Sequence, residues 1–439
     1  MCGAEVDDDR ELRGKHTHQP GNRGCGSVSR AIHACTLGSL RAPPTGRAAH
    51  AWPIRPHAAP ITLTRFPLIR PDVPPIAEWT PLLADAYRER RFTNFGPLSR
   101  RLEDVLRETW CGPGAACVAT SSGTASLAAP LIARGVEGRV ILPAFTFPAT
   151  LSAVRMAGAE PFLVDVSPLD WRLDVETLRR GLDGTGARSA IALCPFGLRS
   201  DFNPHVRLVA ARGGILVVDN AAGLGVAARP VETSTHTFEA CSLHATKPFA
   251  AGEGGVIFAH RAQEADLRQA LNFGLRPGSP TDLRGWGING KMSELHAAVG
   301  LAAACGFDQR LARRRSLVAR YIGVVGRREG VDACTDPDAG AWQFFPVLLP
   351  DGDSAQRFVA EAAARGMETR RYYAPSLSSL PDVDRLGPCP VAEDLAARMC
   401  CVPVYSVVSE TEAEEMVAVF DAALAAALAA PARAAARTS

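Results

Sequence analysis

The stretch FEACSLHATKPFAAGEGGVIFA, residues 238–259, joins two short apolar runs through a loop that contains a lysine and several glycines. Four similar apolar runs precede it, separated by stretches long enough for helices: RVILP (139–143), EPFLVDV (160–166), SAIALC (189–194) and GILVVDN (214–220). Nearly continuous apolar strands that alternate with helices are typical of a sheet buried on both faces and mostly parallel. The sequence therefore predicts an α/β fold whose central, mostly parallel sheet is flanked by helices.

The pattern divides the 439 residues into four parts. Residues 1–60 are rich in Arg, His, Pro and Gly and lack periodicity, so we expect a disordered extension or a translation start assigned too far upstream. Acidic residues at 7–9 argue against an organelle-targeting peptide. Residues 61–310 hold the predicted strands and form the predicted large domain.

The pattern changes after about residue 310. Residues 311–425 predict a smaller α+β domain with a strand in QFFPVLLP (343–350), a helix near 353–365 and a closing helix from about residue 410. Residues 426–439 form an Ala-rich tail in which Pro431 stops the helix, so we expect its end to fray.

Composition excludes several classes of protein. Hydrophobic residues make up 47% and charged residues 21%, which rules out wholesale disorder. A formal net charge of +2 gives no electrostatic basis for binding nucleic acid. No run of about 18 uncharged apolar residues occurs, so no membrane-spanning helix is predicted. We therefore expect neither nucleic acid nor a membrane as a partner.

The twelve cysteines lack the spacing of a metal site or a disulfide framework. There is no CxxC pair and no His/Cys cluster with zinc-like spacing, so no metal is expected. Most cysteines lie in apolar runs, as Cys194 and Cys241 do, where a buried reduced thiol is the common outcome. This usage favours a reducing, cytoplasmic compartment.

Lysine is rare and supplies three of the 48 basic side chains, Lys15, Lys247 and Lys291. A lysine amine can lose its proton when desolvated, and it can then form a Schiff base or carry a proton, which arginine cannot. Lys247 follows a predicted strand and precedes a glycine-rich turn, so it is the candidate catalytic residue. The alternative is a surface lysine in a loop. Lys291 has no role that the sequence indicates.

Two turns carry candidate ligand-binding residues. SSGTASL (121–127) follows the apolar CVAT and opens a predicted helix, whose N-terminus could hold a phosphate or could simply be capped. Asp219 ends the strand in VVDN, at the carboxyl edge where open α/β sheets bind ligands. Its carboxylate could pair with a cationic ring nitrogen, or it could cap a helix or turn.

Two further segments leave alternatives open. Phe145 and Phe147 follow the strand RVILP and could stack on a planar ring, although a buried Phe is more common. Asn289 lies in the loop before KMSELHAAVG and could donate to an anion or serve a turn. The helix that follows places Met292, Leu295 and Val299 on one face, which indicates core or subunit contact.

Taken in order, seven segments resemble the sugar aminotransferases of the DegT/DnrJ/EryC1/StrS family, within the aspartate-aminotransferase-like (fold type I) pyridoxal-phosphate enzymes. The resemblance covers about residues 62–425 and lies in TNFGPLSRRLED, SSGTASL, LPAFTFPAT, GAEPFLVDV, VVDNAAG, SLHATKPFAAGEGG and NGKMSELHAAVG. It implies that pyridoxal phosphate is the cofactor.

The resemblance also implies roles for individual residues. Lys247 would form the Schiff base with the cofactor, Asp219 would pair with its ring nitrogen, and Phe147 would stack on the ring. The phosphate would be held by Gly123, Thr124, Ala125 and Ser242. Asn289 would complete the phosphate site of a neighbouring subunit, which implies a homodimer with shared active sites. His244 matches the family motif without an evident role.

The resemblance has departures on the substrate side. Ala222 stands where the family usually has a glutamine or a similar polar residue, and Tyr372 and Leu377 stand where histidines are usual. The residues that would hold the cofactor are retained, whereas those that would face a sugar are altered.

The resulting prediction is a pyridoxal-phosphate aminotransferase that moves an amino group from glutamate or glutamine to a nucleotide-linked keto-sugar in amino-sugar, polysaccharide or secondary-metabolite biosynthesis. Two alternatives stay open: transamination of another cyclic keto compound such as a cyclitol, and a non-catalytic, cofactor-binding regulatory homologue. A sugar dehydratase of this family, in which histidine replaces the lysine, is opposed by Lys247.

Overall fold

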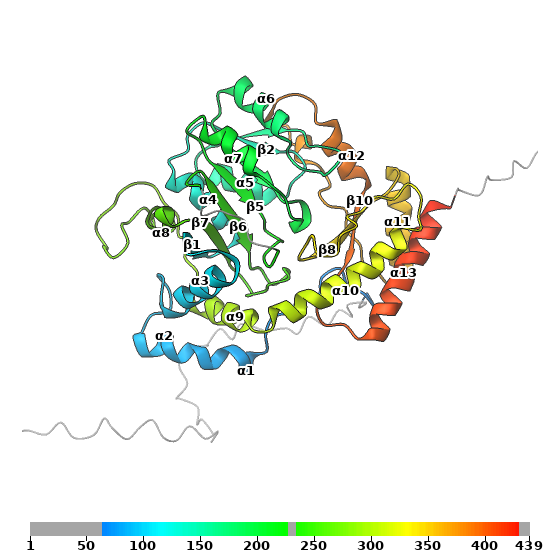
Figure 1. The fold of residues 1–439 in the computed structure, drawn as a ribbon, viewed down its shortest axis with the longest axis horizontal. Helices are drawn as coiled ribbons and strands as arrows, with labels where there is room; N and C mark the ends of the chain where they lie inside the picture. Colours follow the sequence, from blue (N-terminus) through cyan, green and yellow to red (C-terminus); the bar gives the residue numbers. More distant parts are fainter. Residues whose placement is uncertain (1–63, 227–233, 430–439) are drawn as a thin grey trace, which may run out of the picture. The chain divides into compact units, whose positions relative to one another are not determined.

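The computed structural model describes residues 64–226 and 234–429 (Figure 1). The predictions for residues 1–60 and for the tail beyond residue 429 lie outside the described residues. Eight strands of the described chain form the central sheet, in the order β1-β7-β6-β5-β4-β2-β3-β9. Their bounds are Ala115–Thr120 (β1), Arg139–Pro143 (β2), Glu160–Val164 (β3), Ser189–Leu193 (β4), Leu216–Asp219 (β5), Thr237–Ser242 (β6), Gly255–His260 (β7) and Asp384–Arg385 (β9).

The sheet is mostly parallel, as predicted. The pairs β2/β3, β2/β4, β4/β5, β5/β6 and β3/β9 are parallel, whereas β7 runs antiparallel to β1 and to β6. The carboxyl ends of β1, β6, β5, β4, β2 and β3 therefore meet at one edge of the sheet. The register there pairs Leu193 with Asp219, and Asp219 with Ala240. This edge is where ligands are bound in open α/β sheets.

Helices cover both faces of the sheet, which explains the nearly continuous apolar strands (Figure 1). One face packs against α4 (Gly123–Ala133), α5 (Pro148–Met156) and α8 (Glu264–Ala270); Val140, Leu142 and Leu163 belong to that layer. The opposite face packs against α6 (Val175–Thr185) and α7 (Asn203–Ala210) through Ile141 and Val164. At the β1 and β7 end the cover is α3 (Pro97–Trp110) and α9 (Glu294–Ala304).

The C-terminal part of the described chain has its own two-stranded antiparallel sheet (Figure 1). Strand β8 (Phe344–Leu348) pairs with β10 (Met399–Pro403), and α11 (Gly352–Ala364), α12 (Pro390–Arg398) and α13 (Glu410–Leu428) lie beside them. The predicted strand at 343–350 and both predicted helices are confirmed, whereas β10 was not predicted. Helix α10 (Phe307–Val325) spans the boundary proposed near residue 310, and the division into two domains stays a prediction.

The remaining described elements are short. Helices α1 (Ile76–Trp79) and α2 (Leu83–Glu89) precede α3, with a 3-10 turn η1 (Thr80–Leu82) between them. Further 3-10 turns are η2 (Pro195–Gly197), η4 (Arg261–Gln263) and η5 (Leu377–Ser379). Cys194 and Cys241 are buried, as predicted. No helix in residues 64–226 and 234–429 combines the length and apolarity needed to span a bilayer.

Candidate active site

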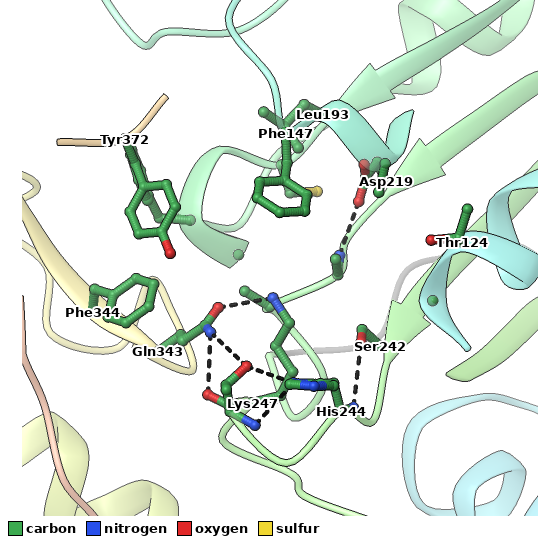
Figure 2. A pocket seen from close by; sticks show the side chains of 18 of the residues that line it. Thr124, Phe147, Leu193, Asp219, Ser242, His244, Lys247, Gln343, Phe344 and Tyr372 are labelled. Atoms are coloured by element: carbon green, nitrogen blue, oxygen red, sulfur yellow. Dashed lines mark hydrogen bonds between the residues drawn. The ribbon is translucent and has the colours of Figure 1, made fainter. Parts of the chain in front are cut away.

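A cavity of about 400 Å³ lies at the carboxyl edge of the central sheet (Figure 2). Its walls come from the turn after β1, the loop after β2, the ends of β4 and β5, and the loop after β6. The start of β8 and the segment 370–373 close it from the C-terminal part of the chain. The cavity therefore brings together residues from most of the length of the described chain.

Most of the residues singled out in the sequence line this cavity. They are Gly123, Thr124, Phe147, Asp219, Ser242 and Lys247, together with His244 and the two departures Ala222 and Tyr372. Phe147 is 51% exposed and forms part of the wall, whereas Phe145 is fully buried in the core. Leu377 and Ala125 are buried outside the cavity lining, and Asn289 is exposed and also lies outside that lining.

The turn after β1 presents the N-terminus of α4 to the cavity. Ser122 caps the helix, because its Oγ accepts a hydrogen bond from the N–H of Ala125 at 3.1 Å. A Cβ on Gly123 would lie 2.8 Å from Cβ of Ser242, so the two turns approach closely here and leave room only for glycine. Backbone N–H groups and the positive end of the helix dipole make such a turn suitable for a phosphate.

The carboxylate of Asp219 is buried at the end of β5. Its Oδ2 accepts a hydrogen bond from Thr150 Oγ1 at 2.7 Å, and its Oδ1 accepts one from the N–H of Ala221 at 3.2 Å. Burial raises its pKa, and these two hydrogen bonds oppose that rise. The positive charge of Lys247 also opposes the rise, and the carboxylate lines the cavity, where it could pair with a cationic group of a ligand.

Lys247 extends its amine into the centre of the cavity (Figure 2). Its Nζ donates a hydrogen bond to Oε1 of Gln343 at 2.8 Å. Desolvation lowers the pKa of Lys247 to about 8, although the negative charge of Asp219 opposes this shift. At pH 7 about a tenth of such an amine is uncharged, compared with less than about a thousandth of an ordinary lysine, and this neutral form can act as a nucleophile or a base.

Asn289 lies beside the turn after β1 of its own chain. The N–H of Ser121 donates to the carbonyl of Gly290 at 2.7 Å, which holds the two segments together. Lys291 Nζ donates to Oδ1 of Asn289 at 2.8 Å and lies 4.3 Å from the ring centre of Phe273. The roles predicted for Asn289 toward a neighbouring subunit, and for Ala125 toward a phosphate, stay predictions.

Several residues of the cavity were not found by sequence reasoning. Gln343 precedes β8, Phe344 is the first residue of β8, and Arg370 and Tyr373 follow α11. Gln343 was visible only as the polar first residue of the predicted strand QFFPVLLP. Thr150, which supports Asp219, belongs to the quoted segment LPAFTFPAT, but nothing local pairs it with a carboxylate 69 residues away.

These groups fit pyridoxal phosphate. The cavity offers a helix N-terminus for a phosphate, an amine for an aldehyde, a buried carboxylate for a protonated ring nitrogen and an aromatic wall for the ring. Within the described residues, no group of three or more His, Cys, Asp or Glu side chains is placed to hold a metal ion.

Known proteins resemble this chain over most of its length. The family "DegT/DnrJ/EryC1/StrS aminotransferase family" matches residues 76–421. Protein Rv3402c of Mycobacterium tuberculosis is 28% identical over 377 residues, which are 81% of this chain and 90% of that protein. The dTDP-4-amino-4,6-dideoxy-D-glucose transaminase of Escherichia coli is 25% identical over 362 residues, covering 79% of this chain and 95% of the relative.

A solved structure shares the fold. The crystal structure of DesI in the presence of its TDP-sugar product superposes with a TM-score of 0.71 and 27% sequence identity. The match covers 82% of this chain and 91% of DesI. The mostly parallel sheet flanked by helices is thus the fold of known aminotransferases.

Proposed function

Because the chain belongs to the DegT/DnrJ/EryC1/StrS aminotransferase family, we propose that it transfers an amino group from glutamate or glutamine to a nucleotide-linked keto-sugar. It is an aminotransferase that uses pyridoxal phosphate, as the enzymes of this family do. The observation that carries the proposal is the meeting of the Lys247 amine and the buried Asp219 carboxylate at one cavity. We place the reaction in the cytoplasm, the compartment that the cysteine usage favours.

The residues divide the work of the reaction. When bound, pyridoxal phosphate supplies an aldehyde and a conjugated ring that accepts the electron pair left on the substrate carbon. Lys247 in its neutral form would take the proton from that carbon and deliver it to the former aldehyde carbon of the cofactor, and it would move a proton in the opposite direction when the acceptor is aminated. Asp219, held by Thr150 and the N–H of Ala221, keeps a proton on the ring nitrogen.

Aromatic side chains support an acceptor that is larger than an amino acid. The rings of Phe344 and Tyr372 stack with centres 5.3 Å apart and an interplanar angle of 21°. Both line the cavity on the side away from Asp219 (Figure 2). Such a wall suits the apolar face of a sugar ring and helps to keep water from the reacting carbon.

A second candidate acceptor is a cyclic keto compound without a nucleotide, such as a cyclitol. It is favoured by Ala222 and Tyr372, which line the cavity where the family usually presents a glutamine and a histidine. The two acceptors differ in the phosphate groups that only a nucleotide-linked sugar carries.

The test is a panel of matched acceptors. Protein loaded with pyridoxal phosphate is supplied with glutamate or glutamine and with a free keto-sugar, the same sugar on a nucleoside diphosphate, or a keto-cyclitol. Mass spectrometry identifies the aminated product. The proposal predicts the highest kcat/KM for the nucleotide-linked sugar. A preference for the cyclitol would favour the second candidate. If no amino group were transferred with any donor or acceptor of the panel, the regulatory homologue would be favoured.

Arg370 is expected to contact the phosphates of such an acceptor. It is the one arginine among the described residues that line the cavity, and the sequence could not single it out among so many. Its Nη1 donates to the hydroxyl of Tyr372 at 3.0 Å and its Nη2 to Oε1 of Glu368 at 3.4 Å, which leaves other N–H groups of the guanidinium for an anion.

Replacing Arg370 with methionine should therefore raise KM for the nucleotide-linked acceptor by about 10- to 100-fold, the usual cost of losing hydrogen bonds to a charged group. The half-reaction with the amino donor should change by less than about twofold, since the donor carries no diphosphate. Arg371→Met is the matched control, because Arg371 is the next residue and does not line the cavity. A loss of rate confined to the half-reaction with the amino donor would contradict this assignment and would indicate that Arg370 binds the carboxylate of the donor.

We also propose a homodimer in which each subunit completes the other's site. Exposed apolar side chains lie in the segment around Asn289: Phe273, Leu283, Trp286 and Leu295. A second copy that covers them would remove apolar area from water.

Shared sites can be tested by complementation of two inactive variants. Lys247→Ala removes the amine, and Asn289→Asp places a negative charge where the partner's phosphate is expected. In a mixed dimer, one site would carry both defects and the other neither. Co-expression should restore about one quarter of the wild-type activity if dimers form at random. Activity no higher than the average of the two single variants would contradict the shared site.

A further inference from the structure

Gln343 contacts the amine of Lys247, although 96 residues separate them in the chain (Figure 2). It is the residue before β8, so the C-terminal part of the chain supplies it to a site built mainly on the central sheet. Neither the sequence motifs nor the names of the relatives assign a role to it.

The orientation of its carboxamide follows from its other partners. Nε2 of Gln343 donates to the backbone carbonyl of Thr246 at 3.1 Å and lies 3.3 Å from Oγ1 of the same residue. A carbonyl oxygen can only accept, so the nitrogen end of the amide must face Thr246. The oxygen end therefore faces Lys247 and can only accept a hydrogen bond from it.

The chain of hydrogen bonds continues with a fixed direction to His244. The N–H of Thr246 donates to Nδ1 of His244 at 3.2 Å, so Nδ1 is an acceptor and the neutral ring carries its proton on Nε2. Oγ1 of Thr246 lies 2.9 Å from the same Nδ1 and donates to it. Nε2 then faces Oε1 of Glu253 at 3.4 Å. The donor and acceptor of each hydrogen bond in this chain are determined by the neighbouring bond. The amide of Gln343 therefore cannot rotate by 180° without breaking several hydrogen bonds.

The backbone before Gln343 is also held in place. Trp342 is fully buried and has a φ of 58°, in the left-handed region that costs a non-glycine residue about 1–2 kcal/mol. Its carbonyl accepts a hydrogen bond from Nη1 of the buried Arg314 at 2.9 Å, and its indole N–H donates to the carbonyl of Pro337 at 2.6 Å. These contacts maintain a conformation that the residue would not prefer, and they fix where the side chain of Gln343 begins.

We propose that Gln343 is the positioning residue of Lys247, whose free ε-amino group it holds through one N–H so that the nitrogen lone pair points into the cavity. The inference rests on the proposed function, since it concerns the amine that reacts with the cofactor. An acceptor stabilises the ammonium form more than the neutral amine, because the charged donor makes the stronger hydrogen bond. Gln343 therefore raises the pKa of Lys247 and so opposes part of the lowering that desolvation causes.

The experiment measures the ionisation of Lys247 in the apoenzyme. Only the neutral amine attacks the aldehyde carbon of added pyridoxal phosphate, with water as the leaving group, so the attachment rate should rise with pH through the pKa of Lys247, which lies at about 8. Stopped-flow absorbance follows the attachment. The other ionisable side chains around the cavity are unchanged in the variants: Cys194, Asp219, His244, Glu253, Arg370, Tyr372 and Tyr373.

Two substitutions should shift the midpoint of this profile in opposite directions. Gln343→Met keeps the length of the side chain but removes the acceptor, so the midpoint should fall by about half a unit to one unit. Gln343→Glu places a carboxylate against the amine, so the midpoint should rise by about one unit or more. If Gln343 had only a structural role, the two substitutions would not shift the midpoint of the pH profile in opposite directions.

The same two substitutions at Gln309, on the exposed face of α10, serve as matched controls and should leave the midpoint unchanged. The inference would be overturned if both Gln343 variants kept the wild-type midpoint, or if both shifted it in the same direction. A wild-type protein that attached no cofactor to Lys247 at any pH would instead overturn the proposed function itself.

Discussion

Replacing Lys247 with alanine is expected to abolish both covalent attachment of pyridoxal phosphate and turnover, with a loss in kcat of roughly 10⁵-fold or more. The reason is that one amine serves twice, first as the nucleophile toward the aldehyde and then as the base at the substrate carbon. Steady-state kinetics and the mass of the borohydride-reduced protein measure the two losses separately.

Lys247→Arg is the matched control for charge. It keeps a cation near Asp219, but a guanidinium neither forms the covalent bond nor gives up its proton at ordinary pH. We therefore expect it to be as inactive as the alanine variant, while circular dichroism shows that both variants are folded. Turnover within about tenfold of the wild type in either variant would remove Lys247 from the chemistry.

Replacing Asp219 with asparagine should lower kcat by about 10²- to 10³-fold, the usual cost of removing one buried electrostatic contact to a reacting group. Asparagine keeps one oxygen, which can accept from the N–H of Ala221, and its NH2 group can donate to Oγ1 of Thr150, so the shape of the site is retained while the charge is lost. The ring nitrogen would then lack the partner that keeps it protonated. Single-turnover rates with the amino donor report this step directly.

The same substitution lowers turnover but should make attachment of the cofactor to the apoenzyme easier at low pH. The charge of Asp219 raises the pKa of Lys247, so its removal should move that pKa further below about 8. The neutral amine then becomes available at lower pH, and attachment to the apoenzyme should extend to more acidic solutions. Asp219→Glu retains the charge and controls for this effect. An asparagine variant with an unchanged donor half-reaction would contradict the role given to Asp219.

Much of the fold could be predicted from local sequence, because each short apolar run of the sequence indicates a buried strand. The apolar runs at 139–143 and 189–194 coincide with β2 and β4, and alternate residues of these strands pack on the two faces of the sheet. The carboxyl edge is then determined by the parallel connections. This explains why Asp219, the last residue of β5, and Lys247, which follows β6, could be expected near one another from the sequence.

Local pattern did not separate Phe145 from Phe147, and only the family resemblance favoured Phe147. Strand β2 ends at Pro143, and the chain then turns, so period-two alternation no longer says which side chain faces the core. Phe145 packs into the core with its ring centre 5.1 Å from that of Tyr373, whereas Phe147 precedes α5 at the cavity. Tertiary contact, rather than local pattern, separates the two residues.

Gln343 and Arg370 were missed for a related reason. Both come from the C-terminal part of the chain, and their place in the cavity depends on how β8 and the segment after α11 pack against the central sheet. No periodicity near Gln343 indicates that its partner is a lysine. The left-handed backbone at residue 342 could not be predicted either, because the residue there is Trp342 and not the glycine that usually adopts this conformation. Their roles follow from three-dimensional contacts only.

The most direct test of the account is to reduce the protein with borohydride after loading it with pyridoxal phosphate, with and without prior addition of glutamate. Absorbance and peptide mass mapping are recorded for both samples. We predict a reduced cofactor adduct on Lys247 without glutamate, and a spectral change with loss of that adduct once glutamate has taken the cofactor from the lysine. A protein that binds no pyridoxal phosphate, or that carries the adduct on another residue, would contradict the central claim.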